Sequence, residues 1–125
     1  QVGSRFAASV ESSAHDNFKE TIVNVKEGGT QLTLKELAPV RLIKNKFYQD
    51  VQDLYEKCRT KEELVALLGR ARSKRGMFEG DLVEGELEIG QIAGIIHEIK
   101  PAAKIVEEMI SDFEKAREEV TNFQF

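Results

Sequence analysis

Cysteine is almost absent from this chain, and its scarcity excludes several kinds of covalent and metal chemistry. The single cysteine, Cys58, rules out an internal disulfide and fits a reducing compartment. The two histidines, His15 and His97, lie far apart along the chain. No spacing among these residues is typical of a zinc site, so we expect no bound metal.

Long apolar runs and an excess of basic residues are also absent. No apolar stretch approaches the ~20 residues that a membrane-spanning helix needs. The formal net charge of −4 argues against a general nucleic-acid surface, because phosphate binding depends mainly on lysine and arginine. With 41% hydrophobic and 32% charged residues, the 125-residue chain has the composition of one globular domain. We therefore expect a cytoplasmic protein that binds neither membranes nor nucleic acid.

Helical spacing of apolar residues is the main pattern that is present. One helix is expected between an N-cap at Asp16 and Gly28, and a later one after a capping box of Thr60 and Glu63. Pro101 suits the first turn of a long last helix. The predicted apolar faces are, in chain order, Phe18, Ile22 and Val25; Phe47, Val51, Leu54, Tyr55 and Cys58; Leu64, Val65, Leu67, Leu68 and Ala71; and Ala102, Val106, Met109, Phe113, Ala116 and Val120.

Strand signals are few. The first residues, up to a turn at Gly3-Ser4, are typical of the end of a buried parallel strand. Residues 31–34 alternate like a strand, although Thr33 could instead open a helical turn, and residues 40–43 favour an extended segment. We expect no second strand to pair with the first, and an unpaired strand cannot satisfy its backbone hydrogen bonds. The chain is therefore expected to be part of a larger protein.

Glycine is concentrated between positions 76 and 94, which predicts a loop whose backbone makes close approaches. The helix that starts at Thr60 is expected to close near Gly76. Beyond the loop, residues 92–99 are expected to form a short buried helix. The loop glycines are Gly76, Gly80, Gly85, Gly90 and Gly94.

Two glycine-containing pairs carry candidate binding chemistry. At Gly3-Ser4 the glycine lets the backbone approach an anion, and the following amide and the Ser4 hydroxyl can donate to phosphate oxygens. Loops after the last strands of (β/α)₈ barrels often bind phosphate, although a glycine at a strand-to-turn junction is more often structural. At Gly90-Gln91 the side-chain amide can donate and accept, which suits a flavin edge or a substrate carbonyl. A glycine-assisted helix start is an equally good interpretation of that pair.

The other reactive side chains are expected to be structural. His15 is expected to bond locally at a helix N-terminus rather than to act as a general base. Cys58 is expected to pack as a small hydrophobic residue. A basic cluster is expected to complement a helix C-terminus rather than to bind an acidic partner. It consists of Arg70, Arg72, Lys74 and Arg75.

Several stretches taken together resemble one protein family over nearly the whole chain. They are QVGSRF, ESSAH, FK, VRLIKNKF and GDLVEGELEIGQIAG, followed by the long last helix. In this order they resemble the C-terminal portion of the flavin-dependent family that contains enoyl-ACP reductase II and nitronate monooxygenase. The resemblance implies the α/β fold class and an FMN-binding (β/α)₈ barrel. Such a barrel needs ~250 residues, so this mostly helical chain would hold about half of one.

The resemblance implies a division of the chain into three segments. Residues 1–15 would be the end of the last barrel strand with its phosphate-binding loop. Residues 16–79 would be a helical insert that covers the active site, and residues 80–125 would be a return loop and the C-terminal barrel helix. The flavin-ring contacts and the catalytic histidine would lie before this chain, so His15 does not inherit the catalytic role and no catalytic residue is assigned here.

The resemblance also implies roles for five residues. Gln1, Gly3 and Ser4 would close on the FMN phosphate. Gly90 and Gln91 would line the substrate pocket. The stretch before that pair, Glu-Leu-Glu-Ile at residues 86–89, departs from enoyl reductases, which often have a serine and a methionine there. This departure leaves the substrate open.

The implied reaction is reduction of an enoyl-ACP thioester in fatty-acid synthesis, with NADPH or NADH as the reductant. The alternative within the same family is oxidation of a small alkyl nitronate by oxygen. A homodimer is an expectation that the sequence does not settle. An alternative of another class is a stand-alone helical interaction module that uses the acidic last helix or residues 64–71 as its docking face.

Overall fold

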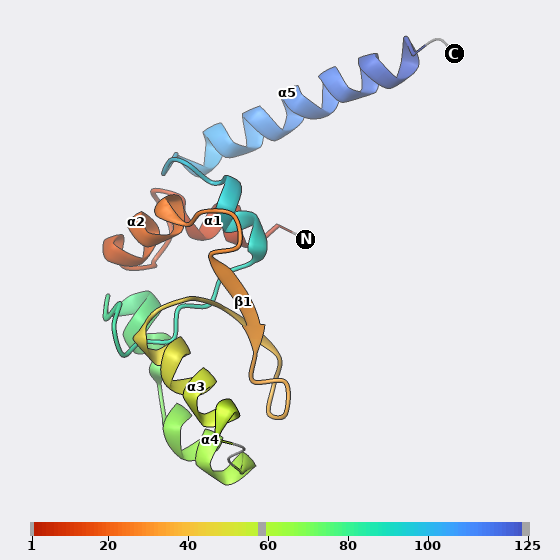
Figure 1. Ribbon diagram of the computed structural model, residues 1–125. Helices are drawn as coiled ribbons and strands as arrows, with labels where there is room; N and C mark the ends of the chain where they lie inside the picture. The colour runs from red at the N-terminus through yellow and green to blue at the C-terminus, as the bar shows by residue number, and fades with distance from the viewer. Residues whose placement is uncertain (1, 58–59, 124–125) are drawn as a thin grey trace.

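The computed structural model describes residues 2–57 and 60–123, so Gln1 and Cys58 lie outside the described residues. Short helices surround one small hairpin, and a long helix projects from one end (Figure 1). The elements are α1 (Ser4–Ala7), α2 (Asp16–Asn24), β1 (Thr30–Thr33), β2 (Val40–Ile43), α3 (Lys46–Glu56), α4 (Lys61–Leu68), the π-helical turn η1 (Lys74–Phe78), the 3₁₀ helix η2 (Gln91–Ile95) and α5 (Ala102–Thr121).

Strand β2 separates two hydrophobic cores, because successive side chains of a strand point to opposite faces. Ile43 belongs to a first core with α2 and η2, whereas Leu42 belongs to a second core with α3 and α4. The first core contains Ala8, Phe18, Ile22, Val25, Ile43, Leu87, Ile89, Ala93 and Ile96. The second contains Leu34, Leu42, Phe47, Val51 and Leu64. Burial of each large apolar side chain contributes about 1.5–3 kcal/mol, so both cores stabilise the fold.

The hairpin decides between the two interpretations of residues 31–34. Strands β1 and β2 pair in antiparallel register, with Thr30 opposite Ile43 and Thr33 opposite Val40. The strand interpretation of residues 31–34 is therefore right, and residues 40–43 are extended as expected. Neither strand pairs with the described residues before Ser4. A third segment adds to the ladder: the Ile43 amide donates to the Leu87 carbonyl at 2.9 Å, and the Ile89 amide donates to the Arg41 carbonyl at 3.1 Å.

The start of the chain also differs from the prediction. In the described residues no strand is present before Ser4; Gly3 is instead the N-cap of α1, and its carbonyl accepts from the amides of Phe6 and Ala7 at 3.0 Å. A turn is predicted at Gly3-Ser4, and in the structure that turn is the first turn of helix α1. The described residues supply no neighbouring strand for Val2, and strand geometry depends on such a partner.

The helix boundaries follow local chemistry where that chemistry is strong. The predicted capping box is present: the Thr60 amide donates to the Glu63 carboxylate at 2.8 Å, and the Glu63 amide donates to the Thr60 hydroxyl at 3.3 Å. The helix ends earlier than Gly76, at Leu68, with Gly69 in the left-handed region at φ +60°. Arg72 accounts for this early end, because its Nε donates to the carbonyls of Leu67 and Leu68.

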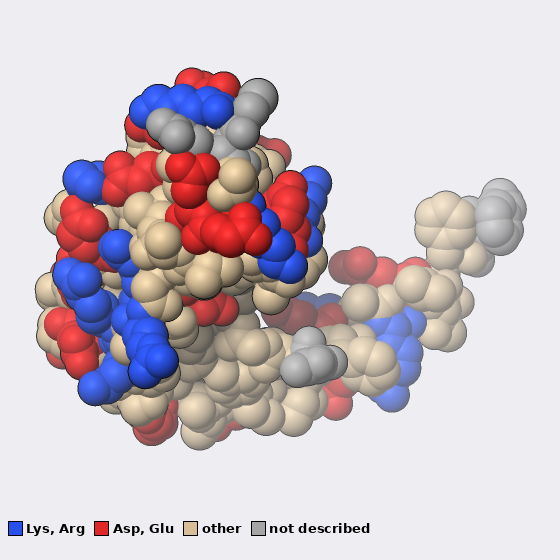
Figure 2. Space-filling model, turned by 90° about the horizontal axis from the view of Figure 1, so that it is seen from below, with Lys and Arg blue, Asp and Glu red and all other residues tan. Residues whose placement is uncertain are grey.

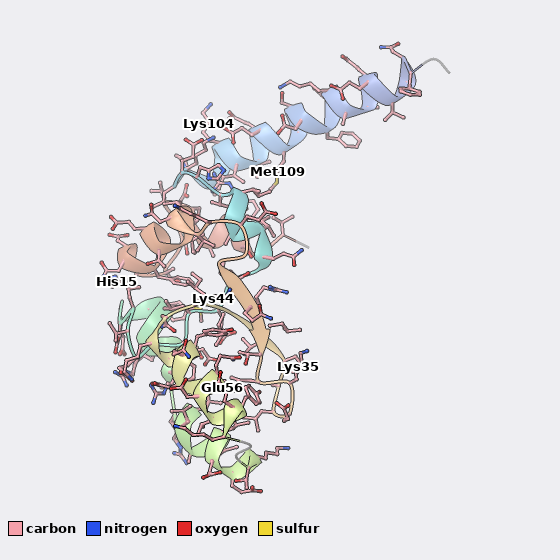
Figure 3. The ribbon with its side chains drawn as sticks, in the orientation of Figure 1. His15, Lys35, Lys44, Glu56, Lys104 and Met109 are labelled. Carbon is pink, nitrogen blue, oxygen red and sulfur yellow. The ribbon has the colours of Figure 1, made fainter. Side chains whose placement is uncertain are left out.

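His15, not Asp16, is the N-cap of α2. Its Nδ1 accepts from the Asn17 amide at 3.1 Å, and Asp16 becomes the first helical residue. The side chain lies between α2 and the segment that contains Gly80 (Figure 3). The expected local hydrogen bond of His15 is thus confirmed, and the predicted cap at Asp16 is wrong by one residue. The helix ends at Asn24, ahead of the expected stop at Gly28.

Helix α5 begins directly after Pro101, as predicted, and projects away from the rest of the molecule (Figure 1). Ile105 is its buried residue, whereas the predicted apolar stripe is exposed. In the view from below, α5 extends sideways beyond the end formed by α3 and α4, where basic and acidic side chains intermix (Figure 2). The exposed stripe residues include Val106, Met109, Phe113 and Val120. The described part of the chain leaves this face of α5 uncovered.

The first loop is joined to the approach to α5. Ser9 forms an isolated parallel bridge with Lys100, and the Val10 amide donates to the Lys100 carbonyl at 3.0 Å. The Glu11 carboxylate accepts from the Ala102 amide at 2.8 Å, which satisfies one of the free amides at the start of α5. The first loop is therefore held beside the segment that leads into α5.

Glu86 is a buried carboxyl group between η1 and the hairpin. It is 6% exposed, and the Ser73 hydroxyl donates to its Oε2 at 3.2 Å. Burial raises the pKa of Glu86, and the nearby charge of Glu88 raises it further. The Ser73 hydrogen bond and the Arg72 charge oppose these two effects. The folded chain therefore holds a proton on Glu86 more tightly than the unfolded chain does.

We expect Glu86→Gln to stabilise the protein relative to wild type at neutral pH. Because the pKa of Glu86 is raised on folding, its contribution to stability is complete below the ordinary value of 4.5 and is lost as pH rises through the folded value. The variant does not titrate at this position and avoids that loss. Denaturant unfolding between pH 4 and pH 8 should show its advantage growing with pH; an advantage that shrinks would contradict this.

Gly80→Ala is expected to destabilise the fold by about 2 kcal/mol. Gly80 has φ +78°, and an added Cβ would lie 2.5 Å from the Nδ1 of His15. The matched control is Gly3→Ala, because Gly3 has φ −111° and an added Cβ meets nothing within 4 Å. Thermal unfolding of the two variants should separate them, and equal midpoints would exclude the steric role of Gly80.

Candidate functional site

The two predicted binding pairs meet in the structure. The Gly90 amide donates a hydrogen bond to the Ser4 hydroxyl oxygen at 3.0 Å, across 86 residues of sequence. A Cβ on Gly90 would lie 2.6 Å from that oxygen, so the close approach requires glycine. Gly90 is also the N-cap of η2, which agrees with the alternative interpretation of the pair as a helix start. One residue thus shapes the site and begins a helix.

The Gly3-Ser4 edge leaves donors available to a ligand. Gly3 is exposed, and a Cβ there would meet no atom within 4 Å, so the backbone borders open space. The first amides of a helix have no acceptor inside the helix, and Ser4 starts α1. Because the Ser4 oxygen already accepts from Gly90, its hydroxyl hydrogen is directed elsewhere. This edge can therefore donate to an anionic group.

A shallow surface cavity of about 540 Å³ borders this edge. The first loop, the start of β2 and the segment before η2 form its walls. Its lining residues are Gly3, Ser4, Ala7, Pro39, Val40, Arg41, Glu88, Ile89 and Gly90. None of them is aromatic. The donors at this wall suit the phosphate end of FMN, whereas nothing in it offers an aromatic face to the flavin ring.

A second cavity, of about 370 Å³, lies beside the hairpin and contains Gln91. Its lining residues are Glu27, Gly28, Thr30, Arg41 and Gln91. The predicted pair Gly90-Gln91 is therefore divided: Gly90 lines the first cavity, and the exposed Gln91 lines the second. Arg41 lines both, so it is the side chain that connects the two cavities.

Sequence reasoning assigned no role to Arg41, although it lies in the stretch VRLIKNKF that supports the family resemblance. One guanidinium nitrogen, Nη1, donates to the carbonyl and to the hydroxyl of Thr30, each at 3.3 Å. The signal that could have found it is an arginine on a short extended segment otherwise made of apolar residues. Its position beside Gln91 depends on strand pairing, which the sequence does not reveal.

Two polar side chains fix the loop that leads into the site. The Nδ2 of Asn45 donates to the carbonyls of Leu82 and Gly85 at 3.0 and 2.8 Å. Asp81 accepts from the Glu84 amide at 2.9 Å and pairs with Arg75 at 2.5 Å. The hydrogen bond from the Glu84 amide, followed by that from Arg75, holds the pKa of Asp81 below its usual value. These contacts order the return loop ahead of Glu86.

The described residues contain neither a cluster of metal ligands nor a helix suited to a membrane span. Within residues 2–57 and 60–123, no three His, Cys, Asp or Glu side chains gather as metal ligands would. In the same part of the chain, no helix is both long and apolar enough to cross a bilayer. His15 is engaged as a helix cap, so the geometry gives it no place in the two cavities.

Comparisons with known proteins agree with this arrangement. A family model described as nitronate monooxygenase matches residues 1–112. Among curated proteins no match is found. The solved structure of FabK from Thermotoga maritima has 32% sequence identity and a TM-score of 0.88, with 98% of this chain covered. A point mutant of FabK from the same organism has 33% identity and a TM-score of 0.79, also with 98% of this chain covered.

The match covers 39% of the FabK chain and 36% of the mutant chain, so this chain spans well under half the length of either. The predicted fold class is confirmed: the chain folds as part of a (β/α)₈ barrel, and that part is mostly helical. The predicted family is confirmed as well. The chain belongs to the nitronate monooxygenase family, a family of oxidoreductases.

Proposed function

We propose that this chain is the C-terminal part of a cytoplasmic FMN-dependent oxidoreductase of the enoyl-ACP reductase II type. FabK is an enzyme of that type, and its fold matches 98% of this chain at 32% identity. The substrate would be an enoyl thioester and the reductant NADPH or NADH. The observation that carries the proposal is the Gly90-to-Ser4 hydrogen bond, which sets the Ser4 hydroxyl and the start of α1 at the rim of a cavity.

Gly3 and Ser4 would hold the terminal phosphate of FMN. The Ser4 hydroxyl can donate to a phosphate oxygen while its own oxygen accepts from Gly90, and such a chain of hydrogen bonds strengthens each member. Gly3 allows the backbone to approach the anion. When bound, FMN supplies hydride transfer. No described residue is assigned to proton transfer, so the part that this chain plays is to bind and orient.

The family model supports a second candidate, oxidation of a small nitronate, because it carries that name and matches residues 1–112. At 32–33% identity the two activities are not separated. The segment Glu86–Ile89 favours neither, because Leu87 and Ile89 are buried and Glu88 lines the first cavity.

The remaining proposals concern how the chain sits in the whole protein. Residues 16–79 would cover the active site, and residues 80–125 would return the chain to the barrel wall. The exposed stripe of α5 would pack against barrel elements outside this chain, since an apolar face of this length is normally covered. A homodimer remains the proposed assembly.

Ser4→Ala is expected to weaken FMN binding about tenfold or more, because a hydrogen bond to a charged group is lost. Flavin fluorescence, followed while the apoprotein of the full-length enzyme is titrated with FMN, measures the dissociation constant. Ser4→Thr keeps the hydroxyl and should bind more tightly than Ser4→Ala. The exposed Ser13 provides the matched control, and Ser13→Ala should bind as wild type does. Equal affinities for Ser4→Ala and Ser13→Ala would remove Ser4 from the phosphate site.

The full-length protein is expected to oxidise NADPH only when a crotonyl thioester is present. Turnover of propyl nitronate with oxygen and without nicotinamide would instead establish the second candidate. Absorbance of the purified protein in the flavin region, together with the two assays, separates these outcomes. A colourless protein that never binds FMN would contradict both candidate activities. It would favour the alternative of a stand-alone helical interaction module.

A further inference from the structure

We propose that Arg41 and Gln91 form a second phosphate-binding site, distinct from the one at Gly3-Ser4, for a ligand that enters beside the hairpin. The site is the cavity of about 370 Å³ that these two residues line with Glu27, Gly28 and Thr30. The proposal rests on the proposed function, because both an acyl thioester carried on a pantetheine arm and a nicotinamide dinucleotide contain phosphate.

The backbone of Arg41 is fixed from both sides. On one side it pairs with Leu32 of β1, and on the other its carbonyl accepts from the Ile89 amide at 3.1 Å. Gln91 follows that same segment after Gly90, whose amide is held by Ser4. The distance between Arg41 and Gln91 is therefore set by backbone hydrogen bonds. A ligand would meet an arginine already held by Thr30 and a glutamine whose backbone position is fixed, which lowers the entropic cost of binding.

The guanidinium group is positioned without being neutralised. Its Nη1 donates to two neutral oxygens of Thr30, each at 3.3 Å. Among residues 2–57 and 60–123, no carboxylate forms an ion pair with Arg41. An arginine carries five N–H donors in a planar fork, so Nε and Nη2 stay available. A fork of this kind binds phosphate through two parallel hydrogen bonds.

Thr30 indicates which cavity the guanidinium serves. Thr30 is 7% exposed and lines the cavity that contains Gln91, whereas it is not part of the wall formed by Gly3 and Ser4. Because Nη1 is bonded to Thr30, the charged end of Arg41 lies on the Gln91 side. Arg41 would therefore not contact the FMN phosphate proposed for Gly3-Ser4 and would be available to bind a different phosphate.

The other groups in this cavity suit a phosphate on a longer arm. The Gln91 side chain is exposed and can donate to a phosphate oxygen or accept from an amide of the arm. Gly28 adopts φ +73°, and a Cβ there would meet nothing within 4 Å, so a ligand can approach the backbone. Glu27 is the one acidic lining residue, and it is exposed, so water solvates its charge.

The test is an equilibrium titration of the full-length protein by calorimetry, with NADP⁺, which cannot reduce bound flavin, and crotonyl-CoA as separate ligands. Arg41→Gln should weaken the binding of one of the two about tenfold or more, because a charge-assisted hydrogen bond is lost. Arg41→Lys, which keeps the charge without the fork, should fall between that variant and wild type. A crotonyl thioester of N-acetylcysteamine has no phosphate, so its KM should not respond to either substitution.

The matched control is Arg117→Gln, which makes the same change of charge on the exposed surface of α5. It should leave every dissociation constant unchanged. Circular dichroism and thermal unfolding of Arg41→Gln establish that the variant is folded. Raising the ionic strength should weaken wild-type binding more than binding to Arg41→Gln, since the lost contact is ionic.

Each outcome bears on the proposal. A selective loss for NADP⁺ identifies the nicotinamide dinucleotide as the phosphate source, and a selective loss for crotonyl-CoA identifies the acyl carrier arm. The proposal is overturned if both constants stay within twofold of wild type, if FMN affinity falls instead, or if wild type binds neither ligand. The titration needs no turnover, so it tests this site independently of the proposed function. A protein that lacks flavin but still shows Arg41-dependent binding would contradict the proposed function and leave this site supported.

Discussion

The hydrogen bond from the Gly90 amide to the Ser4 hydroxyl is the contact on which the rest of the site depends. Strand β2 holds the segment around Ile89 by backbone hydrogen bonds, that segment places Gly90, and Gly90 holds Ser4 at the start of α1. Each step is a directional bond of modest net strength, yet together they define two cavities on either side of Arg41. A methyl group on Gly90 would disturb the whole series.

The two cores explain why this series stays in place. Leu42 and Ile43 enter different cores, so β2 cannot slip by one residue without moving both side chains to the wrong face. Arg72 reinforces the second core: its guanidinium lies 4.8 Å from the Phe47 ring centroid, and its Nη1 donates to the Glu84 carbonyl at 2.7 Å. The segment that carries Glu86 to Gly90 is thus held by η1 at one end and by the hairpin at the other.

The sequence predicts features whose chemistry is local. The Thr60–Glu63 box, the helix after Pro101 and the capping role of His15 all follow from neighbours within a few residues. The hairpin, the early end of α4 and the role of Arg41 depend on contacts between distant segments, which periodicity does not report. The strand expected before Ser4 failed for the same reason, because strand structure depends on a partner. The family resemblance implied a cofactor-phosphate role for Ser4 and a substrate-pocket role for Gly90, and the hydrogen bond that joins them is again a contact between distant segments.

The bridge between the first loop and the residues before α5 sets an order for folding during synthesis. Ser9 and Val10 emerge from the ribosome well before Lys100, their partner, has been translated. The hairpin, α3 and α4 have their main contacts close in sequence, so this region can collapse before the bridge to Lys100 forms. The contact between the first loop and Lys100 therefore forms late, after the residues between them have been synthesised.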